Sequence, residues 1–394
     1  MTSKEHHKHP KLARPGYGFY ARQEWALVGA PCSTIQTLSG QIIEQLSARF
    51  ACAYLDANHQ PVDMPNSLKS GAAMDYVDAI DFKQFNTKGE IGPFQFRALF
   101  NDLDFVLVNG NHHEAAAQIV MIDPDKKDSL HRKLNRLTNV KLLILKDETV
   151  TPFDFLKESI SDLDTVPRVY LQDIDGIVSF FEKEMALNTA MLNGLVLAGG
   201  QSQRMGQDKG LIEWHGIPQR EHLANLLGPL CESVFISCRE DQLAGIHENL
   251  QALPDTFSGL GPFGAILSAF RAYPDRAWLV VACDLPLLDR PSLEYLIQSR
   301  CVKKIATAYR VVDDAFPEPL ITIWEPKAYA VMLSFLAQGY SCPRKVLINA
   351  NAEVITAPNP EALQNVNSRE DFEKMLANPA FSSQLAVDQS KHEL

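Results

Sequence analysis

A glycine-rich stretch that ends in two cations carries the clearest chemical signal in the sequence. The apolar run 194–197 predicts a short buried strand, which stops at the paired glycines Gly199 and Gly200. Glycine lets a backbone turn tightly and approach a ligand closely, and the N–H groups of such a turn bind anionic oxygens. Arg204 and Lys209 follow in the same loop and would neutralise the charge that remains. This combination predicts a loop that binds a triphosphate.

A single acidic residue, Asp284, follows a second apolar run, 277–283, and is itself followed closely by a proline. The run predicts a buried strand of a parallel sheet. A carboxylate at the carboxyl end of such a strand lies where open α/β sheets bind ligands, although an acid there can also serve only to form the turn. Cys283 is interpreted as a small buried apolar residue rather than a nucleophile.

The composition indicates a globular protein with more than one domain. The chain has 394 residues, of which 46% are hydrophobic and 22% charged, so two domains are expected. A net charge of −11 argues against binding to nucleic acid, and no apolar run approaches the roughly 20 residues of a membrane-spanning helix. Residues 1–14 are too polar for a signal peptide. Seven scattered cysteines without a close pair predict reduced thiols and a cytoplasmic location.

The first half of the chain predicts a parallel sheet covered by helices. An apolar strand at 25–29 leads into 30–38, the position where a phosphate-binding loop would lie, and a helix is expected to follow as far as residue 50. Short apolar strands that alternate with longer connections are typical of a parallel sheet. The further strands expected are Cys52–Asp56, Phe105–Asn109, Gln118–Ile122 and Leu142–Lys146, and a closing helix is expected at Ile174–Met185.

The second half also alternates between strand and helix patterns. After the glycine-rich loop, a strand and tight turn are expected at Leu211–Pro218, and a turn with three glycines leads into a helix near Pro262. Ser368 is a natural N-cap for the last helix. The other elements expected are a helix at Leu223–Leu230 and strands at Val234–Cys238, Ile305–Tyr309 and Leu320–Trp324, the last two joined through Pro317–Pro319.

The string Leu197–Lys209, of the form LAGGxSxRMGxDK, resembles the signature of the molybdenum cofactor guanylyltransferases, the MobA type of the nucleotidyltransferase superfamily. So many fixed residue types at fixed spacing rarely coincide by chance. Three further segments match the family's pattern, and the resemblance extends over residues 193–377. These segments are Asp255 with Gly259–Ile266, Cys283–Pro286, and Gln364–Ser368 with the following Glu370 and Asp371.

The resemblance implies functional roles for these residues. The loop backbone, Arg204 and Lys209 would hold the β and γ phosphates of GTP, and Asp284 would bind Mg²⁺. Asp255 is assigned to nucleotide recognition, although taken alone it could equally cap a helix. The residues expected to contact the nucleotide or its acceptor are Leu197, Ala198, Gly199, Gly200, Lys209, Ser237, Asp255, Gly261, Asp284, Asn365 and Asn367, and those expected to act in catalysis are Arg204, Lys209 and Asp284. Arg344 and Lys345 could meet an anionic pterin phosphate or form only a solvated basic pair.

The strand order expected over residues 20–185 resembles the P-loop GTP-binding accessory proteins of molybdenum cofactor synthesis, the MobB type. A working P-loop needs a lysine on the β and γ phosphates and a Ser or Thr hydroxyl on magnesium. Here Thr34, Ile35 and Gln36 stand where Gly, Lys and Ser or Thr are expected, and Asn109 stands where the family usually has an acidic residue. We therefore predict a degenerate P-loop fold without nucleotide hydrolysis, which serves in oligomerisation, docking or support.

Together these observations predict an α/β protein with two three-layer α/β/α domains. The first has a P-loop-like parallel sheet, and the second has a Rossmann-like nucleotidyltransferase sheet of the GT-A-like kind. The boundaries expected are a flexible arm at 1–22, the first domain at 23–185, a linker at 186–192, the second domain at 193–378 and a flexible tail at 379–394.

The resemblance implies transfer of a guanylyl group from GTP to the phosphate of molybdopterin, with Mg²⁺ as cofactor and pyrophosphate as product. A cytidylyltransferase for the same pterin and a non-catalytic carrier or adaptor of the molybdenum cofactor remain alternatives, although the pair Asp208 and Lys209 looks more like the guanylyl branch. The expected partners are GTP, molybdopterin, and molybdoenzymes or other cofactor-synthesis proteins. Neither nucleic acid nor a membrane is expected as a partner.

Overall fold

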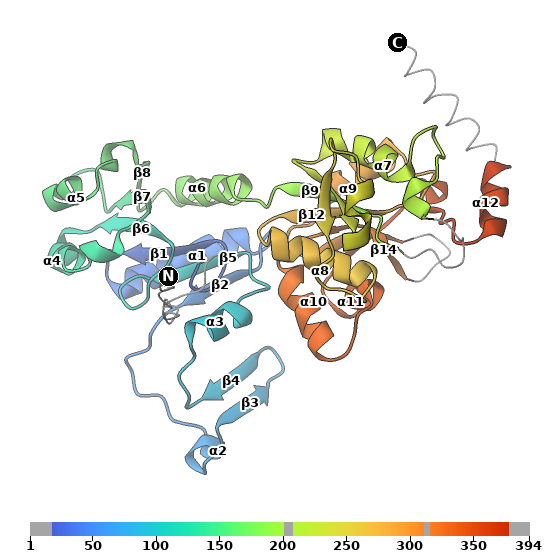
Figure 1. The fold of residues 1–394 in the computed structure, drawn as a ribbon. Coiled ribbons are helices and arrows are strands. Elements are labelled where there is room, and N and C mark those ends of the chain that lie inside the picture. The colour runs from blue at the N-terminus through green and yellow to red at the C-terminus, as the bar shows by residue number, and fades with distance from the viewer. Residues whose placement is uncertain (1–17, 201–207, 311–315, 378–394) are drawn as a thin grey trace, which may run out of the picture. The chain divides into compact units, whose positions relative to one another are not determined.

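Two compact units make up the chain, which divides between Asn188 and Thr189 in the computed structural model (Figure 1). The structure describes residues 18–200, 208–310 and 316–377. Each unit is built on a sheet with helices on both faces, as the alternation of apolar strands and longer connections predicts. None of the helices within the described ranges is long and apolar enough to cross a membrane.

The main sheet of the first unit has six parallel strands in the order β2-β5-β1-β6-β7-β8. Side chains alternate between its faces, so Trp25 and Leu27 pack on one face and Ala26 and Val28 on the other. The strands are β1 (Glu24–Val28), β2 (Cys52–Leu55), β5 (Phe105–Asn109), β6 (Ala117–Ile122), β7 (Val140–Leu145) and β8 (Arg168–Tyr170). All the strands predicted for this half are present, and β8 is additional.

Helices cover both faces of this sheet. Helices α1 (Cys32–Leu46) and α6 (Ile174–Leu187) pack against one face through side chains that include Ile35 and Phe181. Helices α3 (Pro93–Leu99), α4 (Lys127–His131) and α5 (Asp154–Ser159) contribute to apolar clusters on the other face. The remaining short helices are α2 (Asn66–Lys69), η1 (Pro124–Lys126), η2 (Leu134–Arg136) and η3 (Leu163–Thr165). The three-layer arrangement is the predicted one.

Two elements of the first unit differ from expectation. Helix α1 begins at Cys32, so most of the predicted loop 30–38 is helical, because Ile35, Leu38 and Ile42 have helical spacing and are buried. An antiparallel pair, β3 (Met74–Asp78) and β4 (Lys83–Thr87), was not predicted. Most of its side chains are exposed, so the alternation that marks a half-buried strand is absent from its sequence.

The predicted arm of residues 1–22 ends earlier than expected. The backbone N–H groups of Phe19, Tyr20 and Ala21 donate to the carboxylate of Glu24, and Tyr20 and Ala21 are buried. Charge-assisted hydrogen bonds to one buried carboxylate hold this backbone in place, which a polar segment does not reveal from composition alone. Residues 1–17 and the predicted tail 379–394 lie outside the described residues.

The sheet of the second unit has seven strands in the order β11-β10-β9-β12-β14-β13-β15. Strand β14 runs antiparallel to both of its neighbours, and the other pairs are parallel. The strands are β9 (Leu192–Leu197), β10 (Val234–Cys238), β11 (Gln251–Pro254), β12 (Ala277–Ala282), β13 (Ala306–Arg310), β14 (Pro317–Trp324) and β15 (Glu353–Thr356). This mixed sheet has the Rossmann-like character that was predicted.

Helices again cover both faces. Leu279 and Val281 of β12 face α7 (Gln219–Leu227) and α9 (Arg290–Gln298), while Trp278 and Val280 face the opposite layer. That layer consists of α8 (Pro262–Ala272), α10 (Ala328–Ala337) and α11 (Pro343–Asn349). Ser368 caps α12 (Arg369–Leu376) as predicted, because its Oγ accepts a hydrogen bond from the Asp371 N–H at 3.1 Å. The short 3₁₀ helices are η4 (Lys209–Leu211), η5 (Gly228–Leu230), η6 (Glu240–Gly245) and η7 (Pro360–Leu363).

Local predictions for the second unit also need correction. The segment Leu211–Pro218 forms no strand, because Ile212 and Trp214 pack into a small apolar cluster outside the sheet. Pro317–Pro319 is not a connection but the first part of β14. Helix α6 ends at Leu187 and β9 begins at Leu192, so the stretch between these elements is 188–191 rather than 186–192.

Two glycines shape the start of α8. Gly261 precedes the helix with φ of 57° and ψ of −141°, a conformation that residues with a side chain rarely adopt. Gly264 lies so close to the carbonyl oxygen of Phe257 that an added Cβ would overlap it. The absence of a side chain at Gly264 therefore permits the close packing of this turn against the helix.

We expect Gly264→Ala to lower the free energy of unfolding of the second unit by roughly 1–3 kcal/mol, the usual cost of forcing atoms into a packed site. Urea unfolding of the full chain measures this change. Gly245→Ala is the matched control, because Gly245 lies in the 3₁₀ helix η6 and an added Cβ would meet nothing within 4 Å. Equal stability of the two variants would contradict this account of α8.

Candidate active site

The carboxyl ends of three neighbouring parallel strands meet at one cavity of the second unit. In the register of the sheet, Leu197 of β9 lies between Ser237 of β10 and Ala282 of β12. The chain leaves all three strands at this edge, which brings the glycine-rich turn and Asp284 to the same place. The cavity has a volume of about 260 Å³.

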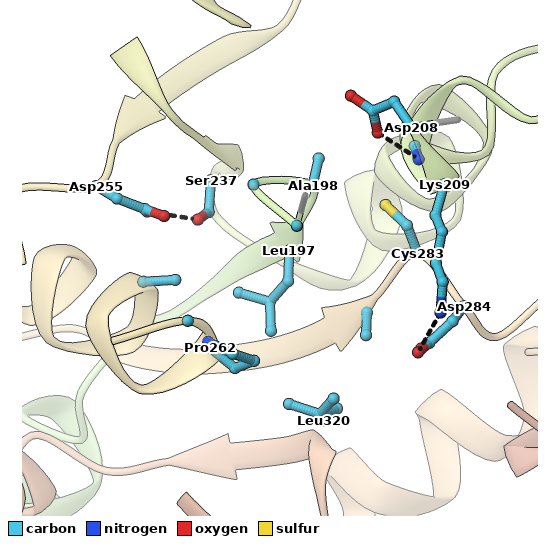
Figure 2. A pocket seen from close by; sticks show the side chains of 16 residues that line it. Leu197, Ala198, Asp208, Lys209, Ser237, Asp255, Pro262, Cys283, Asp284 and Leu320 are labelled. Atoms are coloured by element: carbon cyan, nitrogen blue, oxygen red, sulfur yellow. Dashed lines mark hydrogen bonds and ion pairs between the residues drawn. The ribbon is translucent and has the colours of Figure 1, made fainter. Parts of the chain in front are cut away.

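Most of the residues predicted to contact the nucleotide line this cavity (Figure 2). They are Leu197, Ala198, Gly199, Gly200, Lys209, Ser237, Asp255, Gly261 and Asp284. The lining is completed by Asp208, Gly210, Pro262, Ala265, Ala282, Cys283 and Leu320. Arg204, the remaining residue predicted to act in catalysis, lies outside the described residues. The fold therefore gathers segments that are far apart in the sequence.

Lys209 and Asp284 form an ion pair at this cavity (Figure 2). Lys209 Nζ lies 3.4 Å from Asp284 Oδ2 and 2.8 Å from Asn367 Oδ1. The two charged side chains are only 21% and 14% exposed. The Val366 N–H donates to the Asp284 carbonyl oxygen at 2.9 Å, which ties the segment of Asn367 to the end of β12. Three distant segments thus converge on one ammonium group.

The Asp284 carboxyl is in an environment that opposes its charge. Burial raises its pKa above the usual value of 3.8, and the nearby Lys209 ammonium acts in the opposite direction. Its Oδ1 atom is buried and has no hydrogen-bond partner within the described part of the chain. An unsatisfied oxygen of this kind costs free energy unless a ligand completes its contacts. Asp284 is therefore suited to receive a cation.

Asp284 Oδ1 is one carboxylate oxygen that is available to a cation. No group of three His, Cys, Asp or Glu side chains that could hold a metal occurs in residues 18–200, 208–310 and 316–377. Mg²⁺ is commonly held by one or two carboxylates, with substrate phosphates and water filling the other positions. The unsatisfied Oδ1 of Asp284 is a suitable ligand for that arrangement.

Ser237 and Asp255 form a second polar pair in the cavity. Ser237 Oγ donates to Asp255 Oδ1 at 2.7 Å (Figure 2). Burial raises the pKa of Asp255, whereas the hydrogen bond from Ser237 lowers it. A Cβ on Gly199 would lie 3.0 Å from Asp255 Oδ2, so the glycine permits the turn to approach this carboxylate. Asp255 does not cap α8, whose N-cap position is occupied by Gly261.

Asn365 and Asn367 differ in their relation to the cavity. Neither of them lines the cavity, but Asn367 contacts Lys209, which does. The Asn365 Oδ1 atom is buried without a hydrogen-bond partner in the described ranges. Cys283 lines the cavity, but burial raises the pKa of its thiol strongly, which agrees with its interpretation as an apolar residue rather than a nucleophile.

Glu318 is a charged residue of this region that the sequence did not single out. Arg344 Nη2 lies 3.1 Å from Glu318 Oε2, so Arg344 belongs to an ion pair, and Lys345 Nζ lies 5.4 Å from the centre of the Tyr340 ring. Burial raises the pKa of Glu318, and the negative charge of Asp284 acts in the same direction. Its position between two prolines predicts a connection, whereas the structure places it in β14.

At the corresponding edge of the first unit, described residues border a much smaller cavity. Ile35, at the position of the P-loop lysine, is fully buried in the core. The cavity bordered by Ala30 and Thr34 has a volume of about 10 Å³, close to the minimum for one water molecule. Lys146 also borders it, and its Nζ is paired with Asp123 at 2.8 Å. Ile35 supplies no positive charge here, and the loss of P-loop chemistry in this unit stays a prediction.

Comparisons with known proteins point to the second unit. A family described as the MobA-like NTP transferase domain matches residues 194–354. A molybdenum cofactor biosynthesis bifunctional protein of Synechocystis sp. is 39% identical over 182 residues, which are 46% of this chain and 52% of that protein, so the match spans about half of the relative. A molybdenum cofactor guanylyltransferase of Pseudomonas putida is 32% identical over 185 residues, 45% of this chain and 93% of that protein. Among solved structures, molybdopterin-guanine dinucleotide biosynthesis protein A from Archaeoglobus fulgidus is similar with a TM-score of 0.41 and 20% identity, over 46% of this chain and 95% of that one.

We expect Asp284→Asn to stabilise the second unit at neutral pH when divalent cations are absent. A carboxyl whose pKa is raised by folding destabilises the folded state above that pKa, and the cost vanishes as the pH falls toward the ordinary value of 3.8. The gain should be about 1 kcal/mol at neutral pH and should shrink in mild acid. Thermal unfolding at both pH values measures it, with the exposed Glu240→Gln as control. A loss of stability at neutral pH would mean that the attraction of Lys209 outweighs burial.

Proposed function

We propose that this chain, which belongs to the family of molybdenum cofactor guanylyltransferases, transfers a guanylyl group from GTP to the phosphate of molybdopterin and releases pyrophosphate. The observation that carries the proposal is the Lys209–Asp284 pair beside the glycine-rich turn in one cavity. Nucleotidyl transfer requires a triphosphate to be positioned and its charge neutralised. A cation, a glycine-rich turn that offers its backbone amides and a carboxylate with an oxygen that is free within the described ranges meet that requirement.

In the proposed reaction, an oxygen of the pterin phosphate forms a bond to the α-phosphorus of GTP. The bond between the α-phosphorus and the oxygen that bridges to the β-phosphate breaks, and the electron pair leaves with pyrophosphate. The nucleophile is already an anion at neutral pH, so no general base has to accept a proton. Mg²⁺ bound by Asp284 and the phosphates would polarise the α-phosphate.

The residues of the cavity have separate roles in this proposal. The backbone of 197–200 and the Lys209 ammonium hold the β and γ phosphates, with Arg204 expected to add a second positive charge. Asn367 accepts a hydrogen bond from Lys209 at 2.8 Å and thereby orients the Lys209 side chain. The Ser237–Asp255 pair, on the opposite side of the turn from Lys209 in Figure 2, is left for the base or the sugar.

The alternatives are less well supported. A cytidylyltransferase would use the same phosphate chemistry, but relatives that the chain covers almost completely, from Pseudomonas putida and Pseudomonas aeruginosa, are named guanylyltransferases. A carrier without catalytic activity would have no use for a largely buried lysine and carboxylate paired beside a phosphate-binding turn. Competition among GTP, CTP and ATP for pyrophosphate release separates the two transferases.

For the first unit we propose a role that needs no nucleotide hydrolysis, such as oligomerisation, docking of partners or support of the second unit. Molybdoenzymes and other proteins of cofactor synthesis are the partners in this proposal. We also propose a cytoplasmic location, because all seven cysteines are free thiols, as expected in a reducing compartment.

The main test is incubation of the full chain with Mg-GTP and molybdopterin, followed by mass analysis of the pterin product. We expect a product heavier by one guanylyl group, and roughly a hundredfold or greater loss of turnover in Lys209→Ala and in Asp284→Ala. That loss is the usual scale for removing one preorganised charge. Lys374→Ala, which removes an exposed lysine of α12, is the control and should keep wild-type turnover. Near-normal turnover of either cavity variant at saturating Mg-GTP would refute the roles assigned here.

A second test concerns the number of nucleotide sites. Calorimetric titration of the full chain with Mg-GTP should give one site per chain, because Ile35 replaces the lysine that a P-loop in the first unit would need. In Lys209→Ala the affinity should fall at least tenfold, about 1.4 kcal/mol. Binding that persists at full strength in this variant would place a site in the first unit and contradict the interpretation of Ile35.

A further inference from the structure

The 3₁₀ helix η6 follows β10 and reaches the glycine-rich turn from the side of its carbonyl groups. Two of its neighbouring side chains, Arg239 just before the helix and Gln242 within it, donate hydrogen bonds to that turn. Neither residue lines the cavity. They therefore contact the backbone of the turn on the side that faces away from the cavity.

Arg239 holds the two glycines. Its Nη1 donates to the Gly199 carbonyl oxygen at 2.8 Å and lies 3.4 Å from the Gly200 carbonyl oxygen. The rest of the guanidinium is held by Asp241, because Nε and Nη2 each donate to one carboxylate oxygen at 3.0 Å. A guanidinium fixed by such a two-point pair presents its third donor in a defined direction.

Gln242 connects the two ends of the loop. Its Nε2 donates to the Ala198 carbonyl oxygen at 3.3 Å and to Asp208 Oδ2 at 2.7 Å, and these residues flank the stretch 201–207 that lies outside the described residues. Its Oε1 accepts from the Arg239 N–H at 3.0 Å, which fixes the orientation of the amide. Asp208 Oδ1 accepts a hydrogen bond from the Gly210 N–H at 2.9 Å. The position of Asp208 therefore affects the direction in which the Lys209 side chain extends from the backbone.

We propose that Arg239 and Gln242 are positioning residues for nucleotide binding, which act by holding the carbonyl oxygens of Ala198, Gly199 and Gly200 and the carboxylate of Asp208. This inference rests on the proposed function. A carbonyl oxygen that turned toward the cavity would repel a phosphate, and a glycine pair has little intrinsic resistance to such a rotation. The hydrogen bonds that Arg239 and Gln242 donate to these carbonyl oxygens restrict that rotation before the nucleotide binds.

The decisive variant is Gln242→Glu. A glutamate keeps the oxygen that accepts from the Arg239 N–H, so the start of η6 is preserved. It loses the donor to Ala198 and Asp208 and places a second carboxylate beside Asp208. A purely structural role of Gln242 in η6 would survive this change, whereas a positioning role would not.

Steady-state pyrophosphate release from Mg-GTP and molybdopterin supplies the first readout. We expect the KM for GTP to rise about tenfold in Gln242→Glu and in Arg239→Ala, as for loss of a hydrogen bond to a charged group. Arg239→Lys keeps a cation that can reach Gly199 and should recover part of the loss. Glu240→Gln, an exposed neighbour in η6, is the matched control and should leave KM and kcat unchanged. If a substitution only destabilised the protein, the fraction of active enzyme would fall. The apparent kcat would then decrease and the KM for GTP would stay the same.

Hydrogen exchange without nucleotide supplies a readout that does not depend on activity. Amides of 198–200 and 208–210 should exchange roughly tenfold faster in Gln242→Glu and Arg239→Ala than in wild type or Glu240→Gln. Wild-type exchange and wild-type KM in both variants, with an active wild-type enzyme, would overturn the inference alone. A wild-type chain that neither binds GTP nor releases pyrophosphate would instead overturn the proposed function and this inference with it.

Discussion

The ion pair between Lys209 and Asp284 joins residues that are 75 positions apart, and it exists because two parallel strands are paired in one register. Leu197 at the end of β9 lies opposite Ala282 at the end of β12, so the chain leaves both strands at one edge of the sheet. Apolar side chains on both faces of β12 hold that register. Because the pair is largely shielded from water, its charges act more strongly on their surroundings than exposed charges would.

Shielding a charged side chain from water costs free energy, and the two units differ in whether they carry that cost. In the second unit, burial opposes the ionised forms of Asp284 and Asp255, and the surrounding core must offset that loss. Sites that bind ligands commonly retain such unfavourable groups. In the first unit, Ile35 stands at the position where the sequence predicts a P-loop lysine, and it packs into the core. This apolar side chain contributes to the core and supplies no positive charge there.

Local pattern was a good guide where side chains face a core and a poor one elsewhere. The apolar runs at β5, β10 and β12 predicted strands because buried strands exclude polar residues. The apolar residues of Leu211–Pro218 gave the same signal but pack into a separate cluster. The antiparallel pair β3–β4 escaped prediction because its side chains are largely exposed.

The sequence by itself predicted the chemistry of the second unit, since glycines followed by cations, and an acid after an apolar strand, are residue types and spacings typical of phosphate and metal binding. It also predicted the loss of a working P-loop in the first unit from the identity of Ile35. Only the tertiary structure decided that Asn367 holds Lys209, that Arg344 is neutralised by Glu318, and that Arg239 and Gln242 stand behind the glycine-rich turn. Hydrogen bonds between distant segments depend on the orientation of side chains in the folded state, and no local periodicity encodes that orientation.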